Sequence, residues 1–207
     1  MDDLIGAHLV DGAPLGGSLL LFHDEEPGLW GSMLSATRVM FRANDDPGVV
    51  TAEGTEYDLQ PLGQVALEGL AMPSIASRAE LRQELEVLFA SRDTATSAQT
   101  QVNEALNELM PAVGPSHLLL GAPETRQGPL GAEIASWFRQ PEAEPDRAQF
   151  SEAELRGEGC RPLLQPTDVR HPDLEIDWST AGDIFHVIPE VDLKVKRFDR
   201  VITVFQG

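Results

Sequence analysis

Hydrophobic and polar positions change their periodicity twice along the chain. The first sixty residues are hydrophobic over short runs, which predicts strands over 18–23 and 37–42. The second of these alternates, with Val39 and Phe41 on one face. A turn-forming stretch, Asn-Asp-Asp-Pro-Gly, then predicts a hairpin that returns over 49–52. We therefore expect this part of the chain to consist of strands and turns.

The middle of the chain has the period of helices instead. Helices are predicted over 77–89 and 96–110, because each stretch begins with the spacing of a capping box and continues as a single apolar stripe. Pro111 ends the second helix. A third helix is predicted over 130–138, directly after Pro129, a residue suited to a first helical turn. The first two helices should form a hairpin that lies on an apolar surface.

The last part of the chain returns to short apolar runs. Residues 140–147 are polar with two prolines and predict a linker. The Ser151 and Glu154 pair then predicts a capped short helix. Further strands are predicted over 116–120, 174–178, 184–188, 193–198 and 201–205. The last two of these should pair as a hairpin about Asp199 and Arg200.

The order of these elements predicts an α+β fold rather than a regular βαβ alternation. We expect N-terminal strands, a central helical hairpin plus a third helix, and C-terminal antiparallel strands forming a mixed sheet with helices packed on one face. A chain of 207 residues builds one good core, which predicts a single domain over 1–207. A weak internal boundary at 140–149 is the alternative, at the predicted linker.

Charge changes the functional picture. The chain has 34 acidic and 15 basic residues and a net charge of -19. Such a surface repels phosphates, which argues against nucleic-acid partners and anionic membranes. The last fifteen residues are an exception, since Lys194, Lys196, Arg197 and Arg200 stand there against Asp199. A basic, apolar end on an acidic body predicts steering onto a second copy or a related acidic subunit.

Location and redox chemistry are constrained more weakly. The acidic N-terminal Met1-Asp2-Asp3 does not fit the positive start of a secretory signal, and no apolar run is long enough to cross a membrane. We therefore expect a cytoplasmic or virion location. The single cysteine, Cys160, excludes an internal disulfide, and its glycine-rich surroundings predict an incidental loop thiol rather than a nucleophile.

One acidic stretch is a candidate for metal binding. If 171–177 were one strand, His171, Asp173, Glu175 and Asp177 would line one face, and His23 could join them only through the fold. This predicts, as an alternative function, a metal-assisted hydrolase. The simpler interpretation is a solvated strand face, because alternate residues on a strand lie too far apart for all to reach one ion. We therefore assign no metal, catalytic or cofactor residue.

Other chemistry is not indicated. No phosphate-binding loop, dinucleotide fingerprint, nucleophile elbow or zinc-protease motif occurs. His186, between Phe185 and Val187, is predicted to be a hydrogen-bonded structural histidine. No cofactor is expected, and the simpler interpretation is that the protein is not an enzyme.

These observations favour a non-catalytic structural or protein–protein interaction subunit of a multi-subunit assembly, such as a ring or tube component of a virus particle or phage tail. The apolar C-terminal strand is predicted to contact a neighbouring subunit, since an edge strand can extend a neighbour's sheet. The predicted interface residues are Lys194, Lys196, Arg197, Arg200, Val201, Val204 and Phe205. The partner is predicted to be a protein, either the same chain or a homologous subunit.

Overall fold

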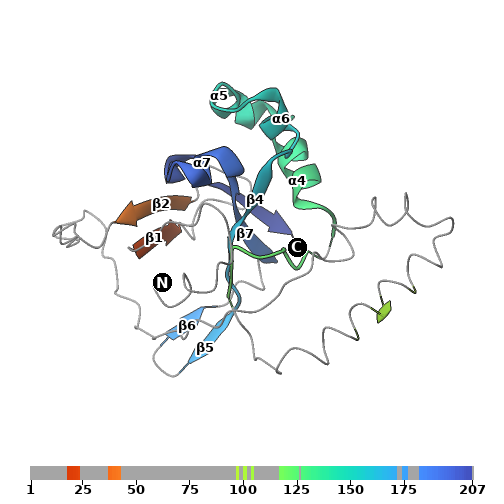
Figure 1. The fold of residues 1–207 in the computed structure, drawn as a ribbon, viewed down its shortest axis with the longest axis vertical. Coiled ribbons are helices and arrows are strands. Elements are labelled where there is room, and N and C mark those ends of the chain that lie inside the picture. Colours follow the sequence, from red (N-terminus) through yellow and green to blue (C-terminus); the bar gives the residue numbers. More distant parts are fainter. Residues whose placement is uncertain are drawn as a thin grey trace.

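The computed structural model describes residues 18–23, 37–42, 97, 100–101, 104, 117–125, 127–171, 174–176 and 182–206 (Figure 1). The strands are β1 (Ser18–His23), β2 (Thr37–Arg42), β3 (Leu118–Leu119), β4 (Cys160–Gln165), β5 (Val169–His171), β6 (Leu174–Ile176), β7 (Asp183–Pro189) and β8 (Ile202–Gln206). The helices are α4 (Leu130–Trp137), α5 (Glu144–Arg147), α6 (Glu152–Leu155) and α7 (Glu190–Lys194), with short 3-10 turns η1 (Pro141–Ala143) and η2 (Phe198–Arg200). Helices and antiparallel sheets together confirm the predicted α+β class.

An antiparallel sheet with the strand order β3-β4-β7-β8 forms the centre of the described part. Its strand β7 is buried from Ile184 to Pro189 because both of its faces are covered. Phe185 and Val187 point to one core and Ile188 to the other. Burial on both faces explains why this strand is apolar on consecutive positions, with His186 as the one polar residue between Ile184 and Pro189, rather than alternating.

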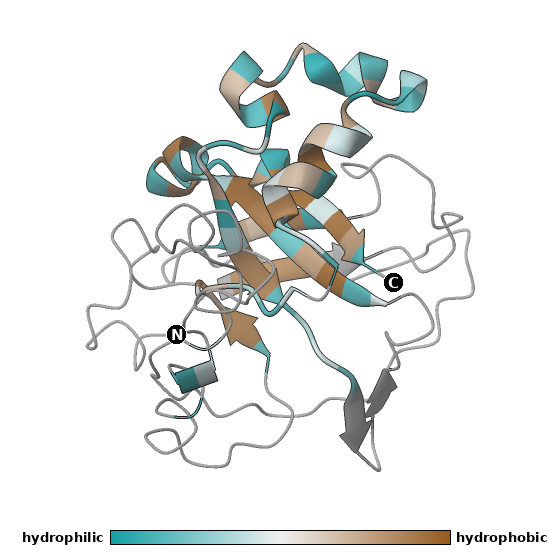
Figure 2. Ribbon diagram, turned by 90° about the vertical axis from the view of Figure 1, so that its right-hand side faces the viewer, coloured by the Kyte–Doolittle hydropathy of each residue, from teal (hydrophilic) through white to brown (hydrophobic). Residues whose placement is uncertain are grey.

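Helix α4 covers one face of the sheet, and the predicted apolar stripe is confirmed. Leu130, Ile134 and Phe138 are buried and belong to the same core as Phe185 and Val204. Trp137 packs at the margin of this core, edge-on to Phe138 with ring centroids 4.9 Å apart. In Figure 2 the hydrophobic strands run through the middle of the described part, with the helices above them.

The opposite face is covered by the β1–β2 hairpin together with α7 and η2. The two strands of the hairpin pair from Ser18↔Arg42 to His23↔Thr37. Val39 is buried in a second core with Leu193, and the ring of Phe41 lies 6.0 Å from that of Phe198. The chain segment after β7 therefore meets the N-terminal hairpin, which the sequence pattern did not predict.

The segment 140–147, predicted as a linker, instead forms η1 and α5. Ala143 is fully buried in the core beneath α4. Arg147 fastens the turns, since its Nε donates to the carbonyl of Phe138 at 2.5 Å and its Nη2 to that of Gln140 at 2.9 Å. A guanidinium that satisfies the last carbonyls of a helix stabilises that end. The composition alone predicted a linker. It could not reveal these bonds, because they join residues seven to nine positions apart.

The predicted cap of α6 is confirmed. Ser151 Oγ accepts from Glu154 N at 3.3 Å, and Glu154 Oε2 accepts from Ser151 N at 2.7 Å. The helix ends in a Schellman motif whose left-handed residue is Gly157, with φ of 76°. This turn approaches the start of α4 so closely that a Cβ on Gly157 would lie 2.3 Å from Gly131 Cα.

The prediction of a strand over 193–198 is wrong, and so is the hairpin about Asp199 and Arg200. The chain leaves β7 at Pro189, forms α7 and η2, and returns as β8, which pairs with β7 from Asp183↔Gln206 to Val187↔Ile202. In a strand, Val191, Leu193 and Val195 would share one face. Folding as a helix instead buries Leu193 in the second core and leaves the two valines exposed.

Other predictions are met in part or lie outside the described residues. The predicted strands over 116–120 and 174–178 correspond to the shorter β3 and β6. Within the predicted helix 96–110, residues 97, 100, 101 and 104 are helical and exposed, as the polar face of such a helix would be. Its apolar stripe, the helix over 77–89 and the strand over 49–52 lie outside the described residues.

Candidate functional site

The predicted interface residues separate into two groups. Lys194, Lys196 and Arg197 are exposed on α7 and the turn that follows it. Arg200, Val201 and Val204 have exposed fractions of 5%, 2% and 0% and lie inside the fold, while Phe205 is half-buried. In this fold the side chains of the buried group do not reach the surface.

The C-terminal strand β8 stands last in the strand order of the described sheet, as an edge strand would. Its residues Ile202, Thr203 and Val204 nevertheless have no exposed surface. A neighbour's strand needs accessible N–H and C=O groups in order to add to an edge. The burial of β8 thus gives no support to strand addition at these residues and turns attention to the exposed residues before it.

Two large hydrophobic side chains are exposed on this segment. Val191 and Val195 have exposed fractions of 61% and 70%, the exposed large hydrophobics of the described residues. Val191 lies in α7 and Val195 directly follows its last residue, and because they are four residues apart they share one side of this segment. Asp192 and Leu193, between them, are buried. We call Val191, Lys194, Val195, Lys196 and Arg197 the α7 surface.

The charges of the α7 surface are partly compensated within the segment. Lys194 Nζ lies 3.1 Å from Glu190 Oε1, and Arg197 Nε lies 3.5 Å from Asp199 Oδ1. Lys196 Nζ lies 4.8 Å from the ring centroid of Phe41 in β2, a cation–π contact. The surface is therefore less positive than the sequence alone indicates, and its valines gain importance.

Lys196 has an unusual backbone for its residue type. Its φ is 60°, in the left-handed region. It ends α7 in a Schellman motif, in which its N–H donates to Leu193 O at 3.1 Å and that of Arg197 to Asp192 O at 2.8 Å. Glycine is the usual residue here, as at Gly157 of α6, since a side chain adds strain. A lysine at this position costs stability but places an amine over the hairpin.

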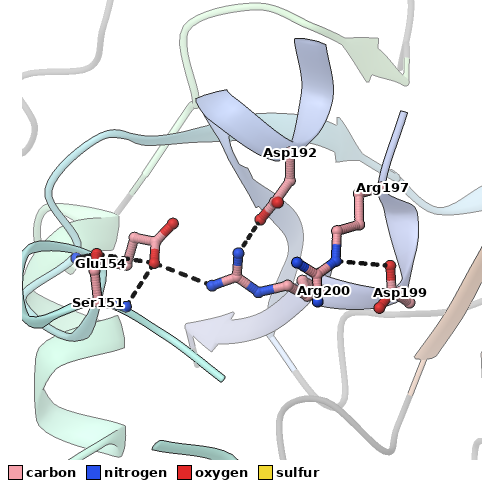
Figure 3. A network of polar contacts seen from close by, with 6 residues as sticks. All are labelled: Ser151, Glu154, Asp192, Arg197, Asp199 and Arg200. Carbon is pink, nitrogen blue, oxygen red and sulfur yellow. Dashed lines mark hydrogen bonds and ion pairs between the residues drawn. The ribbon is translucent and has the colours of Figure 1, made fainter. Parts of the chain in front are cut away.

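Beneath the α7 surface lies a buried ionic network (Figure 3). Arg200 of η2 donates through Nη1 to Asp192 Oδ2 at 2.5 Å and through Nη2 to Glu154 Oε2 at 3.0 Å. The three side chains are 6%, 4% and 11% exposed, respectively. The guanidinium also lies 4.4 Å from the ring centroid of Phe150. Arg200 thus joins α7 to α6, and the capping-box glutamate has a second role that its spacing alone did not reveal.

The two carboxylates of the network differ in their hydrogen bonding and their pKa. Burial raises the pKa of Asp192, since the loss of water outweighs the attraction of Arg200. Burial acts in the same direction on Glu154, but hydrogen bonds from Ser151 and the Arg200 cation outweigh it and lower the pKa of that carboxyl. The fold therefore makes protonation of Asp192 easier and protonation of Glu154 harder than in the unfolded chain.

Cys160 borders this network and is half-buried. Burial, reinforced by the charge of Glu154, raises the pKa of its thiol to about 12. The thiolate is the nucleophilic form of cysteine, so the thiol is unreactive at neutral pH. This agrees with the prediction that it is not a nucleophile, although Cys160 begins β4 rather than lying in a loop.

The predicted row of metal ligands does not lie on one strand. His171 ends β5, whereas Glu175 lies in β6, and the two strands pair with His171 opposite Leu174 and Glu175 opposite Arg170. Asp173 and Asp177 lie outside the described residues, and His23 ends β1, in a different sheet. Within the described ranges no three His, Cys, Asp or Glu side chains gather as a metal site would require. The metal hypothesis stays a prediction without support from the described backbone.

The structural role predicted for His186 is confirmed. It is buried, and its Nδ1 lies 3.2 Å from Oγ1 of Thr203, its register partner on β8. A second histidine, His117, accepts a hydrogen bond from Thr167 N at 3.0 Å through Nδ1. Burial lowers the pKa of His117, so it is neutral at pH 7.

No protein-family model matches the chain, and no curated protein matches it in sequence. None of the helices in the described ranges has the length and hydrophobicity that crossing a membrane requires. With no relative to indicate a function, the exposed valines and cations of the α7 surface are the basis for a functional proposal.

Proposed function

We propose that this protein is a non-catalytic subunit of a multi-subunit assembly and that the α7 surface is its contact with a second copy of the chain. The observation that carries the proposal is the exposure of Val191 and Val195 on one side of α7. Covering a side chain of this size is worth roughly 1.5–3 kcal/mol. Two such side chains ringed by cations resemble the apolar centre and polar rim of a protein interface.

Charge favours a second copy as the occupant. The chain has a net charge of -19, so most of the surface that a copy can offer is acidic. The α7 surface presents Lys194, Lys196 and Arg197 to it. Electrostatic complementarity of this kind contributes to partner choice and to the rate of encounter.

The same charges disfavour contact between two identical α7 surfaces, since cations would then face cations. The neighbouring copy therefore contributes a different surface, which makes the contact heterologous. Heterologous contacts build rings when the rotation closes and open filaments when it does not. A ring or tube, as in a virus particle or phage tail, is the kind of assembly that such a contact would produce.

The test is the mass of the purified protein, measured by light scattering over a range of concentrations. We expect the wild-type protein to associate and Val195→Asp to weaken association by at least about tenfold, the effect of roughly 1.4 kcal/mol. Ala148→Asp is the matched control, because it introduces the same charge at another exposed position. A wild-type chain that stays monomeric, or a Val195→Asp variant that associates like the control, would overturn the proposal.

A further inference from the structure

Helix α7 is short and depends on contacts made by its buried side. It has five residues, and no side chain caps its N-terminus. An isolated helix of this length is not stable in water, so tertiary contacts must hold it. Those contacts come from Leu193 in the second core and from Asp192, which accepts the hydrogen bond of Arg200.

Asp192 thereby fixes the face that α7 presents. It lies directly after Val191, and its carboxylate is held inward by Arg200, so Val191 and Val195 are left outward. The ion pair beneath the helix and the two valines on its outer side belong to one short segment, residues 191–200. We therefore expect a change in the ion pair to act on the exposed surface.

The network has an unequal pair of carboxylates. Glu154 Oε2 accepts three hydrogen bonds, from Ser151 N, Ser151 Oγ and Arg200 Nη2. Asp192 accepts the single side-chain hydrogen bond from Arg200 Nη1. Protonation of Asp192 leaves Glu154 and Arg200 paired, whereas protonation of Glu154 disrupts the capping box as well. Protonation of Asp192, at the α7 end of the network, therefore disturbs fewer hydrogen bonds than protonation of Glu154.

The charged groups around Asp192 act in both directions. Arg200 and Arg197 favour its ionised form, whereas Glu154 and Asp199 disfavour it, in addition to the burial already described. Cys160, on β4, faces the same network and is neutral because its pKa is about 12. Protonating Asp192 relieves the repulsion from the two nearby acids and weakens the hold of Arg200 on α7.

The directions of the two pKa shifts distinguish a loosening of α7 from unfolding of the whole chain. Asp192 has a folded pKa above its ordinary value of 3.8, so the folded chain binds its proton first and this group does not drive unfolding as the pH falls through that window. Glu154 has a folded pKa below its ordinary value of 4.5, so its contribution to stability is lost only as the pH falls below that value. The two directions together mean that the protonation of Asp192 is favoured by the fold and that of Glu154 is opposed by it.

From this arrangement we infer that mild acid weakens assembly through the α7 surface by breaking the ionic hold of Arg200 on Asp192. This regulation rests on the proposed assembly role of that surface. Helix α7 is pinned by the ion pair at neutral pH and is held by fewer contacts once Asp192 is protonated, among them Leu193 in the second core and the Glu190 N–H bond to Gly159 O. The local change is that the charged hydrogen bond between Arg200 and Asp192 is replaced by a weaker, neutral-acceptor one.

The test is self-association measured from neutral pH downwards, with the titration of the Asp192 carboxyl followed by NMR in the same protein. We expect wild-type association to weaken by about tenfold in acid, an effect typical of coupling between two sites. Asp192→Asn, which mimics the protonated carboxyl, should be weakened to the same extent at neutral pH and should not respond further to acid. Glu142→Gln removes an equal charge from the exposed turn η1, away from the network, and should behave like the wild type.

The outcomes distinguish this inference from the proposed function. If Val195→Asp abolishes association but Asp192→Asn associates like the wild type at neutral pH, the acid response is disproved and the interface stands. If Val195→Asp has no effect, the interface itself is disproved. Should Asp192→Asn fail to fold, an NMR titration of the wild-type protein replaces it. The amides of Val191 and Val195 should then shift with the Asp192 carboxyl above pH 3.8 while the sheet amides do not, and amides that do not move would refute the inference.

Discussion

At the scale of single residues, the close approach of Gly157 to Gly131 gives a stability prediction. Gly157 and Gly159 both have positive φ, 76° and 69°, so alanine is strained at either position. They differ in space, because a Cβ would lie 2.3 Å from Gly131 Cα at Gly157 but would meet nothing within 4 Å at Gly159. Gly159→Ala should cost about 1 kcal/mol of unfolding free energy and Gly157→Ala about 3 kcal/mol or more. Chemical denaturation measures both, and equal losses would show that α4 and α6 separate easily.

Single residues also show where sequence reasoning succeeds. The capping box of Ser151 and Glu154 could be predicted because both partners lie within one turn. The bond from Arg200 to Glu154 spans 46 residues, and no local pattern indicates it. Arg200 was consequently counted among the surface cations, although it is buried and paired with two acids. Local hydrogen bonds leave a spacing in the sequence, and long-range ones do not.

At the scale of elements, α7 shows why alternation misleads. Val191, Leu193 and Val195 alternate with charged residues, and this spacing is typical of a strand. The helix forms because Leu193 enters the second core and Asp192 binds Arg200, two contacts with residues outside the local window. The helix α4 was predictable because its stripe is longer and every member faces the same core. Short elements depend on tertiary contacts, so their patterns predict least.

The entry to α4 depends on a glutamine from the last strand. Gln206 donates through Nε2 to Gly128 O at 2.9 Å, and its Oε1 accepts from Gln127 N at 3.5 Å. Removing a side chain that satisfies part-buried backbone groups costs roughly 1–3 kcal/mol. Gln206→Ala should lower the free energy of unfolding by this amount, whereas Gln149→Ala, in the exposed turn after α5, should be within about 0.5 kcal/mol of the wild type. Equal effects in denaturant titrations would show that β8 does not hold this loop.

At the scale of the whole molecule, the charge imbalance has a smaller local effect than the tally of residues indicated. The basic end of the chain loses Arg200 to the interior, and Lys194 and Arg197 have acidic neighbours on their own segment. What remains on the surface is two exposed valines with a modest excess of positive charge. In the proposed assembly, the net charge of -19 would thus bear on which partner approaches, and the valines on how tightly it is held.

This division of roles predicts a specific response to salt. Screening acts on exposed charges and leaves apolar contacts intact or stronger, and the Debye length falls from about 10 Å at 0.1 M salt to about 3 Å at 1 M. Wild-type association should therefore weaken by less than about threefold across that range, because the apolar contact supplies most of its free energy. Reversing Lys194, Lys196 and Arg197 to glutamate should weaken association at low salt and have little effect at high salt, whereas Val195→Asp should weaken it at both. Sedimentation of the three proteins at matched concentrations tests this ordering. An assembly that dissociates in high salt despite intact valines would mean that charge, rather than the apolar side of α7, holds the copies together.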